Sequence, residues 1–176
     1  MAFMDTNQDK RGTIGEQLLL FQDRDMLFNG GVLELVRLKL DAARNAFNRY
    51  QQLYHDRDAV ERETKFTDFL IKVSSRVPDS CLERPALLFR LWRSFEKYIK
   101  SVGSVGVNIL SEIKSSFFRK IRQALEQCNL TGALYIVDTV PTSYVYIQLK
   151  EYSLAIQSLQ ACIPSTPDKC SPQALG

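Results

Sequence analysis

The chain has few of the residues and motifs that most often form catalytic or metal-binding sites. Its 176 residues include a single histidine, His55, and the sequence contains neither a glycine-rich phosphate loop nor a GxSxG nucleophile motif. The four cysteines lie far apart without a CxxC pair, which argues against a zinc site or redox motif and predicts reduced thiols. We therefore predict no catalytic, cofactor-binding or metal-binding residues, and expect that the protein is not an enzyme.

Long hydrophobic runs are also missing. The first twelve residues place charges where a secretory signal would have its apolar stretch. No later run approaches the roughly 20 apolar residues that a membrane-spanning helix needs. We expect a soluble protein of the cytoplasm, with the nucleus as an open alternative.

What the chain does have is enough apolar material for a core, with 45% hydrophobic and 24% charged residues. Apolar residues recur with a period of about 3.6 almost everywhere up to residue 128, which is typical of amphipathic helices. The sequence predicts an all-α fold of antiparallel helical hairpins, stacked as a bundle or a short solenoid. One helical domain is expected over 13–163, between flexible ends at 1–12 and 164–176.

Capping signals predict where the first helices begin and end. Thr13 and Glu16 have the spacing of a capping box, and the glycine pair in Asn29-Gly30-Gly31 is expected to end the helix that they start. A second helix is expected from Val32. Its apolar residues form a heptad-like seam that should pack against a neighbouring helix: Val36, Leu40, Ala43, Phe47, Tyr50 and Tyr54.

Three further helical segments follow. Asp58 and Glu61 predict either a new helix or the continuation of the previous one through a solvated stretch. Another helix is expected from Ser80 to about Val102, and the tight turn at 103–106 should connect it to a return helix. The last two helices would form a helical hairpin.

The segment from Gly132 to Leu149 leaves two interpretations open. It is rich in β-branched and aromatic residues, which favours a β-hairpin that turns at Pro141-Thr142-Ser143. The residues that follow favour a helix instead, and we rank the helix first.

The spacing from Ser143 onward resembles one tetratricopeptide repeat over Ile136 to Lys169. The positions that match in type are Tyr146, Leu149, Tyr152, Ala155, Ile156, Leu159, Cys162 and Pro167. The resemblance implies two packed helices with Ala155 at their closest approach, in a family that binds other proteins. Lys150 and Ser143 depart from the pattern, and Pro141 would shorten the first helix.

A concentration of positive charge is the clearest functional signal. Residues 84–122 carry nine cations against two carboxylates, a local charge of +7 in a chain of net charge +3. Six of the cations are candidate partner-binding residues: Arg90, Arg93, Lys97 and Lys100, which share one helical stripe, with Arg119 and Arg122 on the return helix. The alternative is an ordinary solvated helix face.

The anionic partner of this stripe is expected to be an acidic protein surface. Nucleic acid is disfavoured because the aromatic residues fall on the opposite, buried side, where they could not stack on bases. A membrane is disfavoured because the apolar residues beside the cations belong to the core.

The C-terminal end offers a second candidate surface. The residues after Ile163 are too few and too polar to supply the helix that usually covers the last unit of a helical stack. The expected uncovered face consists of Leu154, Ile156, Leu159 and Ile163. The sequence thus predicts a non-enzymatic adaptor or complex subunit that binds another protein, or a second copy of itself. The alternative is a helical module that docks on nucleic acid or lipid headgroups.

Overall fold

The computed structural model describes residues 9–75, 82–102, 107–137 and 139–161, with the backbone alone for 9–21 and 107. Its described residues form seven helices and one two-stranded sheet, which confirms the predicted all-α class. Packing divides the chain into two compact units, Met1–Ile71 and Lys72–Gly176. One domain over 13–163 stays a prediction, because this division does not show whether either unit folds alone.

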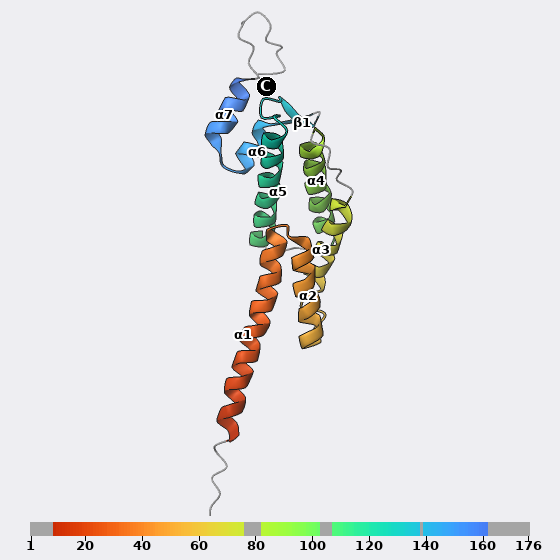
Figure 1. The fold of residues 1–176 in the computed structure, drawn as a ribbon, viewed down its shortest axis with the longest axis vertical. Helices are drawn as coiled ribbons and strands as arrows, with labels where there is room; N and C mark the ends of the chain where they lie inside the picture. The colour runs from red at the N-terminus through yellow and green to blue at the C-terminus, as the bar shows by residue number, and fades with distance from the viewer. Residues whose placement is uncertain (1–8, 76–81, 103–106, 138, 162–176) are drawn as a thin grey trace, which may run out of the picture. The chain divides into compact units, whose positions relative to one another are not determined.

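The first unit is built on a helical hairpin of α1 (Asp9–Val36) and α2 (Leu40–Tyr54), which lie side by side (Figure 1). The predicted seam of α2 is buried at Ala43, Phe47 and Tyr50. A sharp turn joins the helices at Leu38, whose φ of 58° lies in the left-handed region. The seam therefore packs on a neighbouring helix, as its heptad spacing predicts.

The predicted boundary between the first two helices is wrong. The glycine pair does not end α1, which begins before Thr13 and continues through Gly31 to Val36. A Cβ atom on Gly31 would lie 2.6 Å from Cε1 of the fully buried Phe47 ring. Glycine at this position lets the two helices approach closely, and this packing outweighs its low helix propensity.

The next helix is a restart and not a continuation. α2 ends at Tyr54 and is followed by His55, whose φ of 51° is left-handed, and α3 covers Glu61–Ser74. Between them, the Asp56 carboxylate accepts a hydrogen bond from the backbone N–H of Ala59, at 3.1 Å. The chain therefore turns sharply before α3 begins, and the hydrogen bond to Asp56 stabilises this turn.

The second unit contains the predicted hairpin of α4 (Arg84–Val102) and α5 (Val107–Gln127). The expected cap at Ser80 and the expected turn at 103–106 lie outside the described residues. An aromatic cluster joins the two helices, with each ring centroid within 6.4 Å of another ring: Phe89, Trp92, Phe95, Phe117 and Phe118. These rings form much of the core of the unit.

The segment from Gly132 to Leu149 contains both of the structures considered for it, a β-hairpin followed by a helix. β1 (Tyr135–Val137) pairs antiparallel with β2 (Val140–Pro141), and α6 (Ser143–Gln148) follows directly. The hairpin does not turn at 141–143, as the alternative interpretation expected, because Pro141 belongs to β2. Thr142 is fully buried and donates hydrogen bonds to the backbone carbonyls of Ala133 and Leu134, at 2.5 and 3.0 Å. These bonds fix the start of α6 against the segment that precedes β1.

The chain then forms a helix pair of α6 and α7 (Tyr152–Gln160). Lys150 lies between them with a φ of 60°, a conformation that favours the glycine usual there in the repeat family. The pair agrees with the helices that the resemblance implies, although Ile136 lies in β1 and α6 is only six residues long. The tetratricopeptide resemblance itself stays a prediction.

Replacing Ala155 by leucine is expected to lower the free energy of unfolding by about 1–3 kcal/mol. Ala155 is 4% exposed and is the one buried residue of α7, so a larger side chain must displace its neighbours. Urea unfolding followed by circular dichroism measures the change. Ser153→Leu is the control, because Ser153 lies exposed on the same helix. Equal stability of the two variants would contradict close packing at Ala155.

Candidate functional site: a basic cleft beside α4

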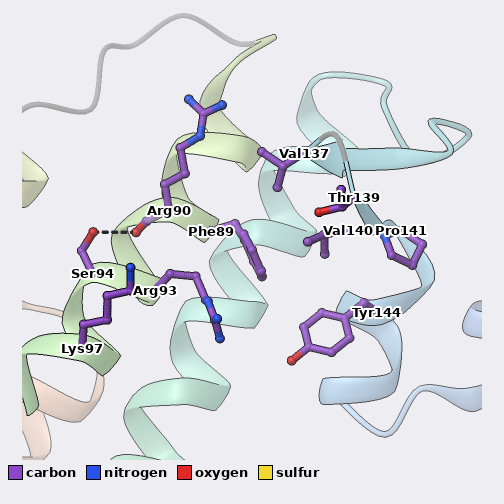
Figure 2. A pocket seen from close by; sticks show the side chains of 10 residues that line it. All are labelled: Phe89, Arg90, Arg93, Ser94, Lys97, Val137, Thr139, Val140, Pro141 and Tyr144. Carbon is purple, nitrogen blue, oxygen red and sulfur yellow. Dashed lines mark hydrogen bonds between the residues drawn. The ribbon is translucent and has the colours of Figure 1, made fainter. Parts of the chain in front are cut away.

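An open cleft of about 670 Å³ lies in the second unit, with α4 on one side and the β-hairpin and the start of α6 on the other (Figure 2). Its lining has two chemically different sides. The polar side comes from α4 and consists of Arg90, Arg93, Ser94 and Lys97. The other side is mainly apolar and consists of Phe89, Val137, Thr139, Val140, Pro141 and Tyr144.

The helical period of α4 places the three cations along the cleft. Residues 90, 93 and 97 are separated by three and four positions, so their side chains leave one face of the helix. The opposite face is buried through Leu91, Trp92, Phe95 and Ile99. Because the apolar face must stay in the core, the orientation of α4 and therefore of its cations is fixed.

Little negative charge neutralises these cations. Arg93 Nη1 lies 2.9 Å from Glu96 Oε2, in a pair whose arginine side chain is still 57% exposed. Arg90 and Lys97 form no ion pair within the part of the chain that the structure describes. Figure 2 shows Arg90 and Arg93 leaving α4 in different directions, with Arg93 extending toward the side of the cleft that carries Tyr144. The cleft therefore has a net positive charge.

The apolar wall is continuous with the core. Tyr144 packs edge-on against Phe89 and Phe118, with ring centroids 6.3 and 5.8 Å apart. Val137 and Val140 stand on opposite strands of the hairpin, in register with each other, and both remain half-buried. Partly exposed apolar side chains held by a packed core are typical of a preformed binding wall.

The other predicted cations lie elsewhere. Lys100 and Arg119 are exposed on α4 and α5 but do not line the cleft. Arg122 is engaged by two carboxylates, with Nε 2.9 Å from Glu126 Oε1 and an ion pair to Glu151 just before α7. This arrangement makes Arg122 a link between α5 and α7, and it reduces the charge that Arg122 can offer to a partner.

The predicted C-terminal face is apolar and exposed where the structure describes it. Leu154, Ile156 and Leu159 are 36%, 54% and 47% exposed, and Tyr152 adds an exposed ring at 60%. Ile163 lies outside the described residues. α7 contains no charged residue, so this surface differs in character from the cleft.

The cysteine and histidine predictions have different outcomes. Cys128 is disulfide-bonded, so the expectation of a reduced thiol at this position is wrong. Sequence spacing alone does not reveal which cysteines folding brings together. The other three cysteines lie outside the described residues, and the cellular compartment stays a prediction. His55 is exposed, as its polar surroundings predict.

The cleft's apolar wall is the part of the site that sequence reasoning missed. The sequence indicates Val137, Val140 and Tyr144 only as possible strand residues in a segment rich in β-branched and aromatic side chains. Their contribution depends on the packing of a hairpin against α4, some forty residues earlier in the chain. The one available signal was the cluster of β-branched residues beside Pro141, which marks a short strand but not its neighbour.

The chain matches no family model, no curated protein and no solved structure. Among the described residues, no group of three or more His, Cys, Asp or Glu is placed to hold a metal ion. No described helix has both the length and the apolar composition of a membrane span. The geometry of the cleft is therefore the basis for a functional proposal.

Proposed function

We propose that this protein is a non-enzymatic protein-interaction module, an adaptor or a subunit of a complex, and that the cleft beside α4 binds an acidic segment of its partner. The observation that carries the proposal is the pairing of a cationic helix face with a partly exposed apolar wall. Cations at the rim attract and orient an acidic partner, whereas the apolar wall contributes binding energy that salt does not screen.

The chemistry of the cleft supports a protein ligand over the other anions. Stacking on bases needs exposed aromatic faces, but Phe89 is 8% exposed and Tyr144 packs edge-on against two other rings. Docking on a lipid surface needs apolar side chains that protrude beyond the cations. Here the apolar side chains line a recess, which suits a narrow polypeptide segment better than a flat membrane.

The exposed apolar surface of α7 supports the broader role of an adaptor. Contiguous exposed apolar side chains are a feature of protein interaction sites. The tetratricopeptide-like pattern in this region is consistent with such a role, and it belongs to the proposal. The cleft and the α7 surface would then be two separate contacts.

Reversing two cations of the cleft is expected to weaken binding of an acidic peptide by about tenfold or more. The probe is obtained by selecting a random phage-displayed peptide library on the full chain, which should enrich peptides rich in Asp and Glu. Fluorescence anisotropy then compares wild type with Arg90→Glu/Lys97→Glu. Both residues lack a carboxylate partner among the described residues, so folding should be unaffected.

Lys100→Glu/Arg119→Glu is the matched control. It changes the net charge equally at exposed positions outside the cleft, and it should leave most of the affinity intact. Equal losses in the two variants would contradict a specific site. Tighter binding of an oligothymidine or of phosphatidylserine vesicles, abolished by the cleft variant, would favour the anionic-surface alternative over the proposal.

A further inference from the structure

We infer that the cleft recognises an extended segment in which acidic and large apolar residues alternate. This inference rests on the proposed function and adds the sequence pattern of the partner. It follows from the arrangement of the two walls, the distance that the cations span along α4, and the volume of the cleft.

The walls face each other across the cleft. Figure 2 shows α4, which carries the cations, on one side and the side chains of Val137, Val140 and Tyr144 on the other, with Arg93 extending across toward Tyr144. In an extended chain, successive side chains point to opposite sides. A segment that lies along the cleft would therefore direct every second side chain to the cations and the intervening ones to the apolar wall.

The span of the cations sets the number of contacts. Arg90 and Lys97 are seven residues apart on a helix that rises about 1.5 Å per residue, so their Cα atoms are separated by about 10 Å. An extended chain advances about 3.3 Å per residue and covers this distance in about three residues. Two carboxylates separated by one residue point to the same side and are about 6.6 Å apart, so both lie within this span, and the residue between them faces the apolar wall.

The volume of the cleft favours an extended segment over a helix. A helix with its side chains is about 10 Å across, so a length of about 10 Å occupies roughly 800 Å³. The cleft provides about 670 Å³. A helical ligand that spans the three cations is larger than this volume, and part of it would lie outside the cleft. An extended segment of a few residues contacts both sides.

Two labelled peptides of identical composition test the pattern. One alternates Glu and Leu over six residues, and the other places three Glu before three Leu. Fluorescence anisotropy with the full chain should show about tenfold tighter binding of the alternating peptide, because only it places leucine against the wall at each intervening position. Equal affinities would overturn the inference and leave the proposed function intact. Failure of both peptides to bind would count against both.

Two protein variants separate the contributions of the walls. Val140→Ser should weaken the alternating peptide and reduce its advantage over the block peptide, because it removes apolar surface from the hairpin wall. Lys97→Ala should weaken both peptides by similar factors, because both carry the same charge. Circular dichroism verifies that each variant is folded, and Val137→Ser replaces Val140→Ser if the latter is not. An unchanged preference in a folded wall variant would overturn the inference.

Discussion

Replacing Phe118 by alanine is expected to lower the free energy of unfolding by about 3–5 kcal/mol, the largest effect among our predictions. Phe118 is fully buried, and its ring lies within 6.4 Å of the centroids of Phe89, Trp92 and Tyr144. Removing the ring leaves a cavity that the surrounding aromatic side chains cannot fill without moving. Urea unfolding followed by circular dichroism measures the loss.

Tyr135→Ala is the control for this prediction. It also removes an aromatic ring from the second unit, but Tyr135 is 57% exposed on β1, and surface substitutions usually change stability by less than about 0.5 kcal/mol. Equal stability of Phe118→Ala and Tyr135→Ala would contradict the proposed core. Because Tyr144 packs on Phe118, the Phe118 variant should also bind the acidic peptide more weakly, provided that it is still folded.

Two adjacent glycines in α1 are expected to respond to alanine in opposite directions. Gly31→Ala should destabilise the protein by about 1–3 kcal/mol, because the new Cβ would lie 2.6 Å from the Phe47 ring. Phe47 is fully buried and has little room to move. Gly30→Ala should stabilise it by about 1 kcal/mol, since a Cβ there meets no atom within 4 Å and alanine is the better helix former.

Comparing the urea midpoints of the two variants gives a direct measurement. The substitutions are chemically identical and occupy neighbouring positions of one helix, so the difference between them reports the contact with α2. If both alanines stabilise the protein, the close approach of α1 and α2 at Gly31 is wrong. If both destabilise it, α1 is not a regular helix at this point.

These glycines also show where sequence reasoning fails. The pair at Gly30-Gly31 has the composition of a helix end, and local propensity predicts one there. The structure places Gly31 against Phe47 instead, and the chain turns at Leu38, which carries no glycine signal. A glycine required for close packing cannot be distinguished from one required for a turn without knowing its distant neighbour.

The helices with strong periodicity were predicted well. The pairing of α4 with α5 follows from apolar spacing, because one face of each helix must be buried. The same spacing places Arg90, Arg93, Lys97 and Lys100 on one stripe of α4, and all four are exposed. Local pattern was sufficient for these features because the partner of each helix is also its neighbour along the chain.

The site as a whole could not be predicted. The cationic stripe borders a cleft only because the short hairpin of β1 and β2 packs beside α4. Neither strand is long enough to show a clear alternating pattern in the sequence. Likewise, Arg122 resembles the other cations in sequence, and only the fold brings Glu151 to it. Contacts between residues distant in sequence determine which charges are available to a partner.

The central claim is that an acidic segment binds in the cleft beside α4, and nuclear magnetic resonance tests it most directly. The backbone amide signals of the ¹⁵N-labelled full chain are recorded during titration with the alternating Glu-Leu peptide. The account predicts that the largest shift changes fall in two separate stretches, 89–97 on α4 and 137–144 in the hairpin and the start of α6. Largest changes on α7 or in α1 and α2, or no changes at saturating peptide, would contradict it.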